Sequence, residues 1–191
     1  MHVTSHRTPD LPDRSADWDR AASFPDYLDT VEETPELWAI TYRRAKVEPE
    51  TLARAEALPG TWKLLALSED WCGDAANTLP VLAKLADDAA NVELRVLGRD
   101  ANPELMDAHL TGGRSRSIPV VLVLDAEGRE HGWWGPRPAE LQTWRLSDEV
   151  REMDKDERYK QVRVWYARDR GRTTLGEVLT LMEQAAAVPA E

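Results

Sequence analysis

The only cysteine of the chain, Cys72, lies in the segment EDWCGDA, residues 69–75. A hydrophobic strand pattern gives way to a helical one at this point, which predicts that Cys72 stands at a helix N-terminus. Unpaired backbone N–H groups and the positive end of the helix dipole stabilise a thiolate there, and the thiolate is the nucleophilic form of cysteine. The position therefore predicts an accessible, reactive thiol.

No second thiol follows, because Ala75 stands where a dithiol oxidoreductase carries its resolving cysteine. A mixed disulfide formed on Cys72 has no intramolecular exit, so an outside thiol must release it. We expect no bound cofactor beyond such a low-molecular-weight thiol.

Acidic residues surround the thiol and oppose its ionisation. Asp74 follows it, and Glu69 and Asp70 precede it. The carboxylates raise a thiol pKa and the helix terminus lowers it, each by on the order of 1 kcal/mol at exposed positions. These opposing effects predict a Cys72 pKa of ~6.5–8.5.

Hydrophobic patterning predicts the elements that position this segment. Strands are expected at 62–68, 92–97, 118–124 and 129–134, and helices after Cys72, at 103–110, 138–145, 156–170 and 174–187, with further short helices over 23–58. A helical crossover favours a parallel pair of strands, and the tight turn at Gly128 favours an antiparallel one. The sequence predicts an α/β fold, a mixed sheet flanked by helices with N-terminal and C-terminal helical extensions. Residues 1–22 are expected to form a polar arm, and 23–191 a single domain.

Three features resemble the thioredoxin superfamily. Trp71-Cys72-Gly73 is similar to the start of its Trp-Cys-Gly-Pro-Cys motif, Pro80 falls where its first active-site helix is kinked, and Ser117-Ile118-Pro119 is similar to its cis-proline loop. WCGDA at 71–75, together with WGPRP at 134–138, resembles a bacterial thioredoxin-like branch.

The resemblance implies a cis bond between Ile118 and Pro119, with Pro119 in contact with Cys72. It also implies a substrate-binding surface, made by Trp71, Gly73, Asp74, Ile118 and Pro119. Asp74 and Ala75 depart from the superfamily motif, and Ala66 replaces the buried acid that many thioredoxins carry. These departures point away from a dithiol cycle.

Four residues are secondary candidates. Arg114 and Arg116 precede Pro119 in a Gly- and Ser-rich loop. They are expected either to be solvated charges or to bind the carboxylate of a peptide-like thiol such as glutathione. Trp134 and Arg137 are expected chiefly to close the last strand onto the following helix.

The composition of the chain argues against several classes of binding partner. A formal charge of −11 disfavours nucleic acid and anionic membranes. The four histidines have no metal-ligand spacing, so no metal is expected. The first twenty residues contain no apolar signal segment, and the cytoplasm is the expected compartment.

The leading hypothesis is a monothiol protein in which Cys72 exchanges with a disulfide or an oxidised thiol. Two alternatives stay open. One is a redox-silent module that binds a dedicated protein partner, and the other is an oxidant sensor that forms a sulfenic acid at Cys72.

Overall fold

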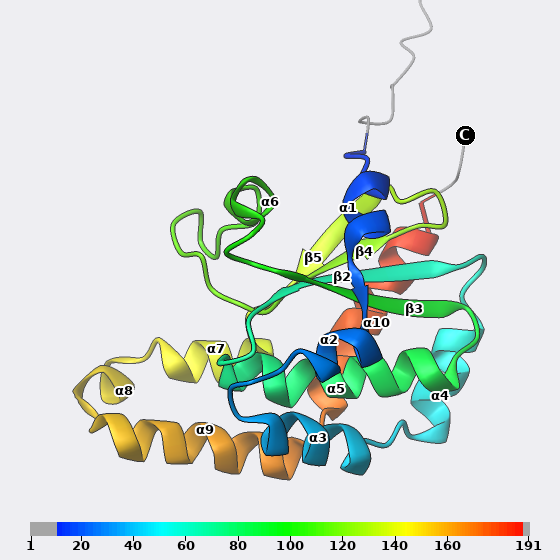
Figure 1. Cartoon of the computed structure of the whole chain (residues 1–191). Coiled ribbons are helices and arrows are strands. Elements are labelled where there is room, and N and C mark those ends of the chain that lie inside the picture. Colours follow the sequence, from blue (N-terminus) through cyan, green and yellow to red (C-terminus); the bar gives the residue numbers. More distant parts are fainter. Residues whose placement is uncertain (1–10, 189–191) are drawn as a thin grey trace, which may run out of the picture.

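The computed structural model describes residues 11–188, which build one mixed sheet covered by helices (Figure 1). Its strands are β1 (Ala22–Ser23), β2 (Trp62–Ser68), β3 (Val92–Gly98), β4 (Val120–Leu124) and β5 (Glu130–Trp134), in the order β1-β3-β2-β4-β5. The β2–β3 pair is parallel and the other pairs are antiparallel. The predicted α/β fold with a mixed sheet is confirmed.

Helices precede, connect and follow the strands. They are α1 (Ser15–Arg20), α2 (Phe24–Asp29), α3 (Pro35–Arg44), α4 (Pro49–Glu56), α5 (Gly73–Asp88), α6 (Pro103–Asp107), α7 (Ala139–Arg145), α8 (Asp148–Glu152), α9 (Lys155–Asp169) and α10 (Arg172–Ala186). Pro80 lies inside α5, as the sequence predicted.

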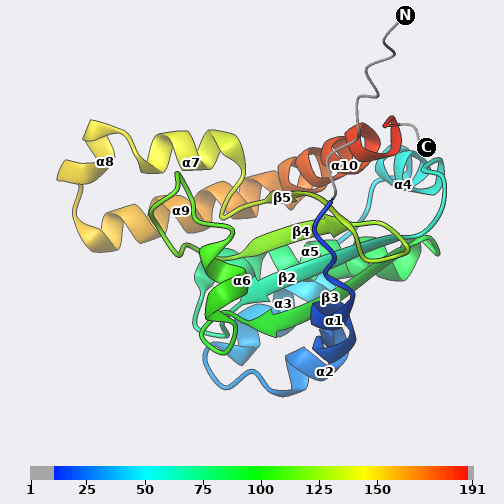
Figure 2. The same ribbon diagram turned by 90° about the horizontal axis from the view of Figure 1, so that it is seen from above.

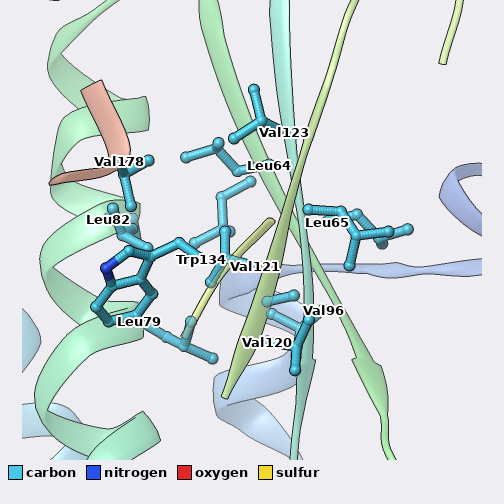
Figure 3. Close-up of a cluster of buried hydrophobic side chains, with 14 of the residues drawn as sticks. Leu64, Leu65, Leu79, Leu82, Val96, Val120, Val121, Val123, Trp134 and Val178 are labelled. Carbon is cyan, nitrogen blue, oxygen red and sulfur yellow. The ribbon is translucent and has the colours of Figure 1, made fainter. Parts of the chain in front are cut away.

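The two faces of the sheet pack against different helices. Leu64, Val121 and Trp134 point toward α5 and α10, whereas Leu65 points to the opposite side (Figure 3). On that opposite side, the guanidinium of Arg95 lies 4.7 Å from the ring centre of Trp18 in α1. Because β2 is buried on both faces, its sequence is a nearly continuous apolar run.

The helices α7, α8 and α9 project beyond one end of the sheet (Figures 1 and 2). Tyr166 is the one buried residue of α9. A polar helix of this kind gains little from apolar burial, so its position depends on a few specific contacts.

Three elements were not predicted: α1, β1 and α8. Residues 1–10 of the expected arm lie outside the described residues. The described part, 11–22, packs on the domain through Trp18, which is 4% exposed. Strand β4 begins at Val120 and not at 118, since a proline cannot donate to a strand ladder. Across residues 11–188, no helix is both long and apolar enough to cross a membrane.

Candidate functional site

Cys72 is the N-cap residue of α5, as predicted, and its sulfur makes two backbone contacts. The Sγ atom accepts a hydrogen bond from the N–H of Ala75 at 3.5 Å and donates one to the carbonyl oxygen of Ile118 at 3.4 Å. The first turn of a helix and the loop before β4 therefore meet at this thiol.

The loop before β4 has the predicted backbone form, with a cis peptide bond between Ile118 and Pro119. Gly135 packs directly behind it. A Cβ atom at Gly135 would overlap the carbonyl oxygen of Pro119. The φ angle of Gly135 is +134°. The segment that follows β5 thus supports the loop that contacts the thiol.

The prediction of an accessible thiol with a pKa near or modestly below its ordinary value is wrong, because Cys72 is only 7% exposed. Burial raises the pKa of the Cys72 thiol from its ordinary value of 9.0 to about 11. The N–H of Ala75 acts in the opposite direction, and the carboxylate of Asp74 reinforces burial. The sequence indicated the helix terminus and the acidic neighbours, but the burial of the thiol, and its effect on the pKa, could not be predicted from local residues.

Asp74 is held by two side chains from the C-terminal part of the chain. The Nη2 atom of Arg137 lies 2.6 Å from one carboxylate oxygen, and the hydroxyl of Tyr166 donates to the other at 2.9 Å. Burial, and then the adjacent carboxylate of Asp74, raise the pKa of Tyr166, so this hydroxyl stays protonated as a donor. We call Asp74, Arg137 and Tyr166 the Asp74 cluster.

The other two acidic neighbours of Cys72, Asp70 and Glu69, accept hydrogen bonds from backbone N–H groups. Asp70 accepts hydrogen bonds from the N–H groups of Glu32 and Glu33 at 3.0 and 2.9 Å. Glu69 accepts one from the N–H of Asp100 at 2.8 Å. Of the three carboxylates expected to oppose the thiolate, Asp74 is the one whose charge raises the pKa of Cys72.

Trp71 is the exposed aromatic residue beside the thiol, at 51%. The guanidinium of Arg99 lies 5.1 Å from the centre of its ring. Gly73 is exposed as well, whereas Ile118 and Pro119 are buried. The expected surface is therefore open on the Trp71 and Gly73 side and closed at the proline loop.

The secondary candidates divide into two groups. Arg137 reaches Asp74, which makes it part of the site. Arg116 forms a two-point ion pair with Asp107 at 2.7 and 2.6 Å, and Arg114 is exposed without a side-chain partner among residues 11–188. The indole N–H of Trp134 donates to Glu177 of α10 at 2.6 Å, a structural contact.

Tyr166 is the residue that sequence reasoning missed. It lies 92 positions from Asp74 in the chain, and no local pattern in α9 distinguishes it. Within the described residues, no group of three or more His, Cys, Asp or Glu side chains is arranged to hold a metal ion.

Known proteins resemble this chain at the level of family and fold. The family model described as Thioredoxin matches residues 21–153. A protein of unknown function from Pseudomonas aeruginosa superimposes with a TM-score of 0.71 at 20% identity, over 87% of this chain and 95% of that one. An HIV epitope-scaffold gives 0.72 at 18% identity, over 91% of this chain and 99% of that one. None of the curated proteins matches. At these identities the structural likeness concerns the fold alone.

Proposed function

Because the chain belongs to the thioredoxin family, we propose that it carries out thiol–disulfide exchange through Cys72, with an external thiol in place of a resolving cysteine. The observation that carries this proposal is the contact of Cys72 Sγ with the Ile118 carbonyl at the cis bond before Pro119. It joins the only sulfur nucleophile of the chain to a loop that can align a disulfide against it.

The reaction has two balanced steps. The Cys72 thiolate attacks one sulfur of a disulfide, a new S–S bond forms, and the other sulfur leaves as a thiolate. An external thiolate then attacks the substrate sulfur of this mixed disulfide, which returns Cys72 as a thiolate and leaves the substrate joined to the external thiol. The substrate is a disulfide or an oxidised thiol, and the expected compartment is the cytoplasm.

The approach is from the exposed side of the site. Trp71 offers an apolar surface beside the sulfur, and Gly73 leaves room for a substrate backbone. With a pKa of about 11, only about one thiol in 10⁴ is ionised at pH 7, so exchange is slow unless the substrate itself lowers that pKa.

Intact-mass measurement tests the proposal. We expect the protein, incubated with 2-hydroxyethyl disulfide, to gain one adduct on Cys72 that disappears when an external thiol is added. The Cys72→Ser variant is the control and should gain none. A native chain that stays unmodified, while the denatured chain is modified, contradicts the proposal.

Burial of the thiol favours a second candidate, a redox-silent module that binds a protein partner at the same site. A buried cysteine behaves as a small apolar side chain. The same experiment separates the two, since this candidate predicts no adduct on the native protein.

A further inference from the structure

Two further arginines lie near Arg137, which belongs to the Asp74 cluster. Arg137 precedes α7, Arg145 ends α7, and Arg158 lies on α9. Arg158 and Arg137 both act on Arg145, and the carboxylate that offsets them there is Asp74. Arg137 and Arg158 therefore lie close enough to Arg145 to repel it, and the nearby carboxylate, Asp74, is already paired with Arg137.

Arg137 donates from Nη2 to Asp74 and from Nη1 to Gln142, whereas Arg145 and Arg158 have few acceptors. The Nε atoms of Arg137 and Arg158 are buried and have no acceptor. Arg158 has one weak contact, from Nη1 to the carbonyl of Val150 at 3.5 Å. Among residues 11–188, Arg145 makes no side-chain hydrogen bond and no ion pair. Burial is the main cause that lowers the pKa of Arg145, followed by repulsion from Arg158 and Arg137.

Buried donors without acceptors and an excess of positive charge are both unfavourable unless an anion completes the site. The fork of N–H groups on a guanidinium matches the two oxygens of a carboxylate. The chain as a whole carries a charge of −11, so this positive cluster runs against the overall charge.

We propose that Arg145 and Arg158, next to Arg137, form an anion-binding subsite that takes a carboxylate of the disulfide or thiol reacting at Cys72. This inference rests on the proposed function and deepens it. Arg137 pairs with Asp74, two residues from Cys72, so the subsite adjoins the turn that carries the thiol. The carboxylate comes from a peptide-like small thiol or from an acidic peptide segment.

Exchange rates with disulfides of different charge test the subsite. We compare adduct formation on Cys72 from oxidised glutathione, which carries carboxylates, with that from neutral 2-hydroxyethyl disulfide. The ratio of the two rates removes general effects of a substitution on the thiol. Arg158→Gln and Arg145→Gln should each lower this ratio about tenfold, the factor that corresponds to one charge-assisted hydrogen bond.

Arg163→Gln is the matched control, since Arg163 is exposed on the same helix, α9, outside the cluster. Its ratio should equal that of the unmodified protein. Equal ratios in all four proteins overturn the subsite while leaving exchange at Cys72 intact.

Binding without chemistry separates the subsite from the proposed function. S-methylglutathione cannot exchange, and calorimetry should detect its binding to the unmodified protein and a loss of about tenfold in affinity in Arg158→Gln. A thiol-free acidic tetrapeptide forms the second arm, and tighter binding of the peptide identifies the peptide as the source of the carboxylate. Absence of binding by both probes, or unchanged affinity in Arg158→Gln, refutes the subsite even where no disulfide reacts.

Discussion

The state of the Cys72 sulfur depends on a competition between solvent loss and local hydrogen bonding. Burial disfavours the thiolate, while the N–H of Ala75 favours it, and burial is the larger effect. The Asp74 carboxylate adds to burial, although its pairing with Arg137 offsets part of that effect. A free thiol of this kind is protonated at neutral pH and becomes reactive as pH rises.

Replacing Asp74 by Asn should lower the pKa of Cys72. The substitution removes the negative charge and leaves Arg137 uncompensated beside the thiol, so both changes favour the thiolate. The rate of iodoacetamide alkylation against pH gives the midpoint, expected at about 11 in the unmodified protein. Asp88→Asn, at the far end of α5, is the control and should not move it. An unchanged or higher midpoint in Asp74→Asn would show that Asp74 serves the helix alone.

Two contacts fix the elements around the site. Tyr166 attaches α9 to the first turn of α5, and Gly135 lets the end of β5 approach the loop before β4. The strands and most helices were predictable, because buried strands such as β2 are continuous apolar runs and α5 has a helical apolar period. The attachment of α9 to α5 was not predictable, since it depends on one long-range hydrogen bond, from Tyr166 to Asp74, made by an otherwise polar helix.

Tyr166→Phe should lower the free energy of unfolding by about 1 kcal/mol, the net contribution of one partly buried hydrogen bond. Urea denaturation measures this change. The control is Tyr159→Phe, on the same helix, where the ring is 51% exposed and the hydroxyl makes no hydrogen bond among residues 11–188. Equal stabilities of the two variants would contradict the role of Tyr166 as an attachment.

Gly135→Ala should destabilise the protein by about 2 kcal/mol more than Gly132→Ala. Both glycines have a positive φ, at +134° and +153°, but only Gly135 has an atom in the way of an added Cβ, the carbonyl oxygen of Pro119. The pair of variants therefore isolates the close approach from the backbone strain. Thermal or urea unfolding gives the comparison, and similar losses in the two would refute the packing argument.

At the scale of the whole molecule, a buried charge network joins the N-terminal helix to the sheet. Glu130 of β5 lies 2.7 Å from His109, beyond the end of α6, and 2.7 Å from Arg14, beside α1. Burial opposes ionisation of Glu130, but the hydrogen bonds from His109 and Arg14 outweigh it and hold the pKa of this carboxyl below its ordinary value of 4.5. Arg14 and Glu130 are 116 residues apart in the chain, so local sequence patterns could not predict their contact.

A lowered carboxyl pKa stabilises the fold above the pKa of the unfolded chain, and that contribution is lost as pH falls through the lower folded value. Glu130→Gln should therefore destabilise the protein at pH 7, and the difference from the unmodified protein should shrink below about pH 4. Unfolding by urea at several pH values measures it, with exposed Glu93→Gln as the control. A difference independent of pH would show that the charge of Glu130 contributes nothing.

The whole-molecule features also set the limit of sequence reasoning. Trp71-Cys72-Gly73 and Pro119 identified the family and the meeting of the start of α5 with the loop before β4, because these features depend on local residue types. The burial of Cys72 depends on what the remainder of the chain places around it. The Asp74 cluster likewise needs residues 137 and 166 to return to the start of α5.

The most direct test of monothiol exchange is the reduction of a protein disulfide as the external thiol concentration varies. The unmodified protein should turn over in proportion to external thiol and accumulate a Cys72 mixed disulfide when that thiol is withdrawn. In Ala75→Cys the introduced thiolate should attack Cys72 and expel the reduced substrate without external thiol, once per protein molecule, leaving an internal disulfide. Ala75→Ser, similar in size, should not release the substrate. Release of the substrate by the unmodified protein as fast as by Ala75→Cys, without accumulation of a Cys72 adduct, would contradict monothiol exchange.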